Sequence, residues 1–188
     1  NQSIGKRYFK RMNKKLKLWE LNRKTEDEFR KQKKFSIVVV LDDIRSLNNI
    51  GSFFRTADAF NIEKIILLGI TATPPHRDIH KTALGSTETV RWEHQEDKLM
   101  CLKELKNKGY ELCVLEQTEK TTLLQEVSSL PNRPTALIFG NEVNGVAQEL
   151  IDFSDRIIEI PQFGTKHSLN VSVCAGIVMW EFCKKHIE

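Results

Sequence analysis

The sequence of 188 residues lacks any hydrophobic run long enough to cross a membrane. Its longest apolar stretches, such as Ile37–Leu41 and Leu137–Phe139, are far shorter than the roughly 20 residues that a membrane-spanning helix requires. The first residues are basic, but no apolar segment follows them, so they do not resemble a secretory signal. These absences argue against a membrane protein and lead us to expect a cytoplasmic one.

Cysteine is scarce, and no pattern in the sequence would hold a metal ion. The four cysteines are scattered, without a Cys-x-x-Cys pair and without histidines at metal-ligand spacing beside them. We therefore interpret them mainly as reduced residues that pack in the core. His76 and His80 lie four residues apart, but two prolines precede them and no third ligand is evident. We expect no metal site.

The glycine pattern excludes the common nucleotide-binding motifs. No two of the nine glycines are separated by a single residue, so the G-x-G turn of the dinucleotide-binding and Rossmann-type methyltransferase folds is absent. Gly140 and Gly145 have the spacing of a phosphate-binding loop, but Val146 and Ala147 stand where that loop requires Lys and Ser or Thr. The G-x-S-x-G turn of serine hydrolases is also missing.

Positive charge is concentrated in one leading arm. Residues 1–34 contain thirteen Lys or Arg and four acidic residues, whereas the rest of the chain is net acidic. An excess of this size favours binding to a polyanion such as nucleic acid. Aromatic residues among the bases could stack on nucleobases or could instead dock the arm onto the rest of the chain. They are Tyr8, Phe9, Trp19 and Phe29.

Short apolar runs alternate with helical patterns along the remaining sequence. The run Ser36–Leu41 has no polar alternation, which is typical of a strand buried on both faces of a parallel sheet. We predict strands over residues 36–41, 64–68, 90–93, 111–115, 135–139 and 156–160. We predict helices over residues 3–33, 49–60, 79–84, 97–108, 122–127, 148–153 and 168–186. This order predicts a basic helical arm over residues 1–34 and an α/β domain over residues 35–188, with a mostly parallel sheet and helices on both faces.

Two polar segments lie after predicted strands, at the edge of the sheet where open α/β folds bind their ligands. The first begins the helix after the first strand, and there Asn49, Ser52 and Arg55 recur every three residues along one side. The second, residues 139–146, is a sharp polar loop in which Glu142 is the only carboxylate. Taken alone, each could be an ordinary helix cap or exposed turn.

The third segment runs from the last predicted strand through a loop into the final helix. That helix is apolar nearly all round, which indicates burial on more than one side. Ser168, Asn170 and Ser172 lie at its expected buried beginning, where each polar group needs a partner. A helix cap would explain Ser168 but not the other two.

Together the three segments resemble the TrmH family of the SPOUT superfamily, the tRNA/rRNA ribose 2′-O-methyltransferases. The first is similar to the family pattern N-x(5)-R-T-A-D-A, from Asn49 to Ala59. The second is similar to G-x-E-x-x-G-V from Gly140, and the third to I-P-x-x-G-x-x-x-S-L-N-V-S-V from Ile160. The resemblance covers about residues 36–187 and leaves the basic arm outside it.

The resemblance implies a fold, an assembly and a reaction. The family fold ends in a deep C-terminal trefoil knot, and the family forms homodimers through the last helix. Its members transfer a methyl group from S-adenosylmethionine to a ribose 2′-hydroxyl of RNA and release S-adenosylhomocysteine. Transfer from a sulfonium needs no metal, because proximity and alignment supply much of the acceleration. We therefore expect a tRNA or rRNA as the partner.

The resemblance also implies site residues. Carried over by position, the catalytic residues would be Asn49, Arg55, Glu142, Ser168 and Asn170. The cofactor would be held largely by backbone groups of Leu115, Glu116, Gly140, Ile160 and Leu169. A guanidinium stays protonated at ordinary pH, so we expect Arg55 to bind a phosphate and stabilise the developing alkoxide rather than act as a base.

Two other functions remain open at this stage. One is a non-catalytic RNA-binding or ribosome-assembly factor with the same fold, although the intact polar residues of the third segment argue against it. The other is an enzyme that methylates a base nitrogen, as other SPOUT branches do. Arg55 together with Asn170 favours the ribose.

Overall fold

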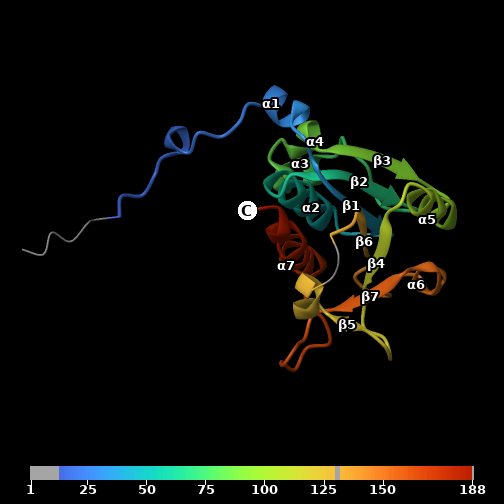
Figure 1. The fold of residues 1–188 in the computed structure, drawn as a ribbon. Coiled ribbons are helices and arrows are strands. Elements are labelled where there is room, and N and C mark those ends of the chain that lie inside the picture. Colours follow the sequence, from blue (N-terminus) through green and yellow to red (C-terminus); the bar gives the residue numbers. More distant parts are fainter. Residues whose placement is uncertain (1–12, 130–131, 188) are drawn as a thin grey trace, which may run out of the picture. The chain divides into compact units, whose positions relative to one another are not determined.

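The computed structural model describes residues 13–129 and 132–187 (Figure 1). It divides into two compact units, residues 1–31 and residues 32–188. Within the described residues, the second unit contains one sheet of seven strands, every pair of which is parallel. The strands are β1 (Phe35–Asp42), β2 (Ile62–Leu68), β3 (Arg91–Gln95), β4 (Glu111–Leu115), β5 (Thr122–Leu123), β6 (Thr135–Phe139) and β7 (Arg156–Glu159). Their order in the sheet is β3-β2-β1-β6-β4-β7-β5.

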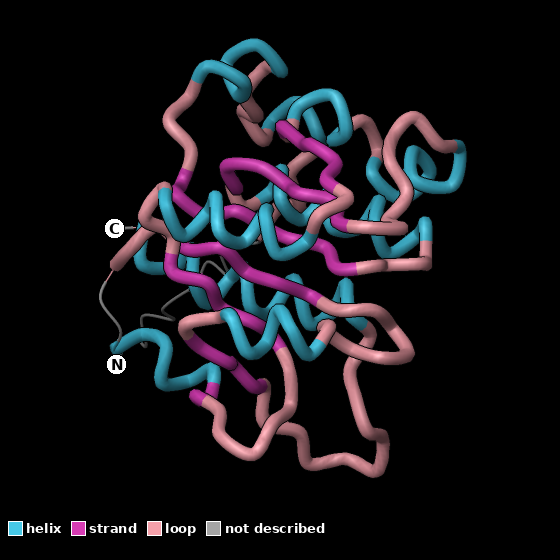
Figure 2. Tube along the Cα trace, turned by 90° about the vertical axis from the view of Figure 1, so that its right-hand side faces the viewer, coloured by secondary structure: helices cyan, strands magenta, loops and turns pink. Residues whose placement is uncertain are grey.

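Helices cover both faces of the sheet, as Figure 2 shows for the strands that run between two helical layers. One layer contains α2 (Leu47–Ala59), α3 (Arg77–Ala83), α4 (Ser86–Thr89), α7 (Val171–Cys183) and the 3-10 turns at Leu124–Ser129 and Lys184–His186. The other contains α5 (Lys98–Asn107) and α6 (Gln148–Phe153). This confirms the predicted α/β class with a parallel sheet.

Alternation along β1 explains why the sheet needs both layers. Ile37, Val39 and Leu41 pack into the core beneath α2 and α7, whereas Val38 and Val40 pack into the core beneath α5 and α6. All five are at most 2% exposed. A strand with apolar side chains on both faces can bury them only between two layers, so the prediction from its unbroken apolar run is confirmed.

Helix α2 begins and packs as its sequence dictates. The side chain of Ser46 accepts a hydrogen bond from the backbone N–H of Asn49 and caps the first turn. Ile50, Phe53 and other apolar residues of the buried face are fully enclosed. The rings of Phe53 and Phe139 pack edge to face, with their centroids 5.2 Å apart. This contact holds α2 against the end of β6.

The predicted helix over residues 3–33 is wrong for most of its described part. Of residues 13–33, only Leu18–Glu20 form a 3-10 turn and only Glu26–Lys31 form α1; residues 3–12 lie outside the described residues. Leu18 and Trp19 are both strongly exposed. Helix-forming residues alone do not sustain a helix in water when no apolar face is buried.

Smaller differences occur elsewhere in the sequence. Thr122 and Leu123 form strand β5, paired with Ile158 and Glu159 of β7, where we predicted the start of a helix. Helix α4 was not predicted, because four residues are too few to show a period. The six strands that we predicted are present, with ends shifted by at most two residues.

The described residues also bear on the remaining predictions from composition. None of their helices combines the length and apolar character needed to cross a membrane. No cluster of potential metal ligands occurs among them. Cys101, Cys113 and Cys183 are buried free thiols, as predicted, whereas Cys174 is only partly buried.

The carboxyl ends of four strands meet at one edge of the sheet. Leu41 of β1 and Leu115 of β4 both lie opposite Phe139 of β6, and Leu115 lies opposite Ile158 of β7. The residues that follow these positions therefore form a row along that edge. In parallel sheets this is the edge where ligands bind.

Candidate functional site

A cavity of about 660 Å³ lies at this edge of the sheet. It is lined by the ends of β4, β6 and β7, by the loops that follow them and by the first residues of α7. The sequence-predicted residues in its lining are Leu115, Glu116, Gly140, Glu142, Ile160, Ser168, Leu169 and Asn170. Segments far apart in the sequence thus converge on one cavity.

The loop after β6 turns sharply because it contains two glycines. Asn141 and Gly145 exchange backbone hydrogen bonds of 3.0 and 2.9 Å, so the loop returns to its own beginning. A Cβ atom on Gly140 would lie 2.1 Å from the carbonyl carbon of Gly145, and Gly145 itself has a φ of +69°. Both positions therefore require glycine.

Glu142 ties this loop to the beginning of α2. Its carboxylate accepts hydrogen bonds from the backbone N–H groups of Arg45 and Ser46, at 3.1 and 3.0 Å, and from the side-chain amide of Asn49, at 3.0 Å. Burial alone would raise the pKa of Glu142, but these hydrogen bonds outweigh it and hold the pKa below its ordinary value. The carboxylate is thus fixed in its charged form.

Asn170 extends the same network to the last helix. Its amide nitrogen donates to the side-chain oxygen of Asn49 at 3.3 Å, and its own oxygen accepts from the N–H groups of Ser172 and Val173. Asn170 is therefore the cap of α7, which begins at Val171 and not at Ser168 as predicted. The prediction of a buried beginning is also wrong, because Ser168 and Asn170 are exposed.

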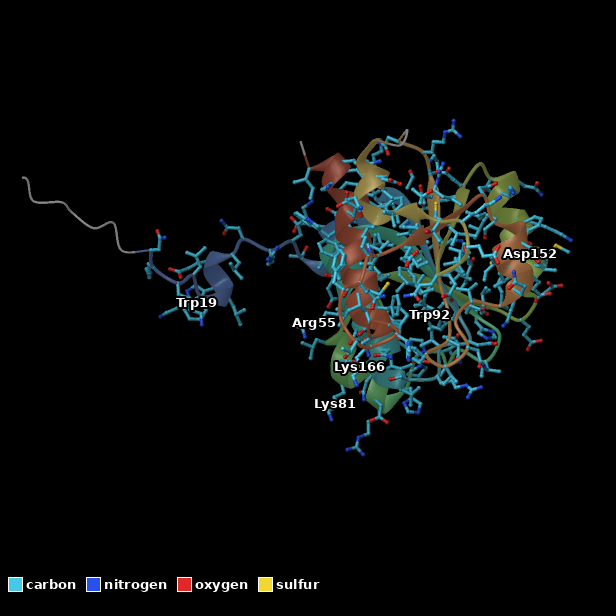
Figure 3. All side chains as sticks on the ribbon, turned by 90° about the horizontal axis from the view of Figure 1, so that it is seen from below. Trp19, Arg55, Lys81, Trp92, Asp152 and Lys166 are labelled. Atoms are coloured by element: carbon cyan, nitrogen blue, oxygen red, sulfur yellow. The ribbon has the colours of Figure 1, made fainter. Side chains whose placement is uncertain are left out.

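Arg55 lies apart from the cavity. It is exposed on α2, its side chain points outward in Figure 3, and it is not part of the cavity lining. Within the described part of the chain, its guanidinium makes no hydrogen bond or ion pair, and Asp58, three residues further along α2, accepts a hydrogen bond from Thr89. Arg55 is thus free to contact a ligand outside the cavity.

Reasoning from the sequence missed the residues that support the loop. Asn141 is buried, donates to the carbonyl of Asp43 at 2.7 Å and accepts from the N–H groups of Val143 and Asn144. Asp42 is 1% exposed, accepts from the N–H of Ala147 and pairs with Lys98 at 2.6 Å. Two acidic residues directly after a buried strand were the one available signal for this support.

Comparison with protein families gives a match over most of the chain. The SpoU rRNA Methylase family matches residues 36–180. A tRNA (guanosine(18)-2′-O)-methyltransferase of Aquifex aeolicus is 29% identical over 81% of this chain and 71% of its own length. A 23S rRNA (guanosine-2′-O-)-methyltransferase RlmB of Nitrosomonas europaea is 31% identical over 81% of this chain. The chain spans 58% of that relative, less than two thirds of its length.

Solved structures share the fold. The TrmH/SpoU tRNA modifying enzyme of Aquifex aeolicus superposes with a TM-score of 0.77 at 26% identity, over 86% of this chain and 81% of that one. An AdoMet-bound rRNA methyltransferase of Sinorhizobium meliloti gives a TM-score of 0.75 at 25% identity, over 85% of this chain and 60% of that one.

The lowered pKa of Glu142 predicts a pH-dependent contribution to stability. A carboxylate whose folded pKa lies below its ordinary value of 4.5 stabilises the fold above that pH, and this stability is lost as the pH falls through the folded pKa. We therefore expect Glu142→Gln to have a lower free energy of unfolding than wild type at neutral pH. In acid, this difference in free energy should become small. Urea unfolding at a series of pH values measures the difference.

Glu104→Gln, which removes one exposed carboxylate from α5, is the matched control for the loss of charge. A difference between wild type and Glu142→Gln that stays constant from neutral pH to well below pH 4.5 would contradict the prediction.

Proposed function

The chain belongs to the SpoU rRNA methylase family, and from this premise we propose that it transfers a methyl group from S-adenosylmethionine to a ribose 2′-hydroxyl of RNA. The observation that carries the proposal is that two of the family segments line one cavity, with Glu142 and Asn170 in its lining, and that Asn49 of the first segment is hydrogen-bonded to both. The sequence resemblance to the TrmH family is thereby confirmed at the level of the family.

The cavity fits the cofactor in size and in the kind of groups that line it. Its volume of about 660 Å³ lies within the usual range for cofactor sites. Backbone groups at the ends of β4, β6 and β7 would hold the cofactor at Leu115, Glu116, Gly140, Ile160 and Leu169. When bound, S-adenosylmethionine would supply a methyl group whose bond to sulfur breaks, with its electron pair left on sulfur, as the bond to the ribose oxygen forms.

The polar residues at the edge of the cavity would orient the ribose. Glu142 and Asn170 hold the side chain of Asn49 from two sides, so its amide is fixed before RNA binds. The exposed hydroxyl of Ser168 adds a further hydrogen-bonding group to the lining. Groups fixed in advance need no reorganisation during the reaction.

Arg55 would act on the RNA outside the cavity. It lies two helical turns from Asn49 on α2, and its guanidinium has no partner within the described residues. A permanently charged fork of donors suits the phosphate next to the target ribose, and its charge would stabilise the oxygen as its proton passes to solvent.

We further propose that the basic arm of residues 1–34 contacts the RNA backbone. Lys15 and Arg23 are exposed residues of its described part. Replacing both by Gln should reduce the salt dependence of RNA binding. The slope of log K against log salt concentration should become less steep by about 0.7 for each lost contact to a phosphate of single-stranded RNA. Lys103→Gln on α5 together with Lys108→Gln directly after it is the control, and an unchanged slope in the arm variant would contradict the proposal.

A homodimer through α7 would complete the assembly. Within this chain α7 is buried on one side only, and Val173, Ile177 and Trp180 form an exposed apolar row at positions i, i+4 and i+7. A second copy of α7 would cover this row, which accounts for a helix that is apolar nearly all round. Sedimentation that finds only monomers at micromolar concentration would contradict the dimer.

We also propose that the protein acts in the cytoplasm on tRNA or rRNA. We propose in addition that its C-terminal segment is knotted, as in the TrmH family. A hydrogen bond of 3.1 Å from Gln117, after β4, to the carbonyl of His167 supports close packing of the two loops that a knot would bring together. A crystal structure with an unthreaded C-terminal trace would contradict the knot.

Methyl transfer to RNA tests the proposed reaction. The protein is incubated with labelled S-adenosylmethionine and total RNA from cells that lack it, and the tRNA and rRNA fractions are digested to nucleosides. We expect a labelled 2′-O-methyl nucleoside in one fraction, which also identifies the substrate class. A base-methylated nucleoside, or cofactor binding without transfer, would contradict the proposal.

Arg55→Ala is the informative variant in the same assay. We expect turnover to fall by about 10²–10⁴, the range for one positioned catalytic group, with cofactor affinity unchanged. Arg77→Ala on α3 removes another exposed arginine and serves as the control. Full turnover in Arg55→Ala would exclude the role given to Arg55.

A further inference from the structure

The cavity lining is acidic. Three carboxylates belong to it, those of Glu116, Glu142 and Glu159, and among the described residues that line it there is no Lys or Arg. His167 is the only other titratable base or acid of the lining besides the thiol of Cys174. The fixed charges around a bound ligand are therefore negative.

Of these three carboxylates, Glu116 is the most informative about the ligand, because of where it lies and what it contacts. It follows the last residue of β4 and reaches across to the loop after β6, where it accepts from the N–H of Val146 at 3.1 Å. A Cβ atom on Gly145 would lie 2.1 Å from its Oε2 atom, so the carboxylate lies directly against that loop. Its other oxygen accepts from the N–H of Gln117 at 2.8 Å.

No positive side chain neutralises this carboxylate within residues 13–129 and 132–187. Its hydrogen bonds come from two backbone N–H groups only, and none of the ion pairs in this part of the chain includes it. By contrast, the nearby carboxylate of Asp42 is paired with Lys98. Glu116 therefore keeps its charge available to a ligand in the cavity.

The charge of Glu116 also acts on another residue of the lining, Cys174. Cys174 belongs to α7 and lines the same cavity. Burial raises the pKa of its thiol to about 11, and the negative charge of Glu116 contributes to the rise. A cation bound in the cavity near Glu116 and Cys174 would be stabilised by the negative charge of the Glu116 carboxylate.

We propose that Glu116 makes the cavity selective for the cationic, methyl-carrying form of the cofactor over the demethylated product. The two ligands differ by the methyl group and by one positive charge on sulfur, which the acidic lining favours. This inference rests on the proposed function, because it takes S-adenosylmethionine as the ligand. Loss of the sulfonium charge on transfer would then weaken binding and help the product to leave.

A purely structural role for Glu116 makes a different prediction. If the carboxylate only anchored the loop after β6, its loss would weaken every adenosyl ligand equally, whatever the charge. A selective carboxylate weakens only the binding of ligands that carry a positive charge at the position of the sulfur. Glu116→Gln separates the two roles, because the amide oxygen can still accept a hydrogen bond but the charge is gone.

Isothermal titration of the full chain with three ligands provides the test. S-adenosylmethionine and sinefungin are cationic at the position of the sulfur, the latter through an amine, whereas S-adenosylhomocysteine is neutral there. We expect Glu116→Gln to bind the two cations about tenfold more weakly and the neutral ligand within about twofold of wild type. Glu119→Gln, an exposed acid three residues away and outside the lining, should change none of the three.

Equal weakening of all three ligands, or of none, would overturn the proposal. Thermal melting checks that Glu116→Gln folds. If it does not, wild type still decides: binding of the two cations should weaken with added salt more than binding of S-adenosylhomocysteine, and equal salt dependence would overturn the proposal. Failure of wild type to bind any of the three would instead refute the proposed function.

Discussion

The hydrogen bonds around Glu142 connect parts of the chain that are almost a hundred residues apart. One carboxylate accepts from two backbone N–H groups before α2 and from the amide of Asn49, and Asn49 in turn accepts from Asn170. Because a carboxylate has room for several donors, it can fix a loop that has no regular structure of its own. The loop after β6, the start of α2 and the start of α7 therefore depend on one another.

The parallel sheet makes this connection possible. Since neighbouring strands end at the same edge, β1, β4, β6 and β7 deliver their following loops to one place. The glycines at positions 140 and 145 then let one loop bend back over the strand ends. Buried Asp42, which pairs with Lys98, accepts a hydrogen bond from the N–H of Ala147 just after this loop. The result is a cavity with a fixed polar edge and an acidic lining, and Arg55 lies on α2 outside it, with no partner among the described residues.

Local patterns in the sequence predicted the fold well where burial alone decides the structure. The apolar runs of β1, β2 and β6 became buried strands, and α2 formed within two residues of its predicted bounds. The same patterns failed in the basic arm, because helix-forming residues there have no apolar face to bury. They also placed the start of α7 three residues early, because the hydrogen bond from Asn170 to Asn49, a contact between distant segments, is not contained in the local sequence. Asp42, Lys98 and Asn141 act through contacts between distant segments, which local patterns do not contain.

Glu142 and Asn49 act as one unit that joins the segments of the site. A double-mutant cycle of Glu142→Gln and Asn49→Ala, measured as the free energy of unfolding in urea at neutral pH, tests it directly. We predict that the two effects are not additive, with a coupling energy of about 0.5–3 kcal/mol, because the charge-assisted hydrogen bond between the two side chains requires both the carboxylate of Glu142 and the amide of Asn49. Effects that add to within about 0.3 kcal/mol would contradict the account.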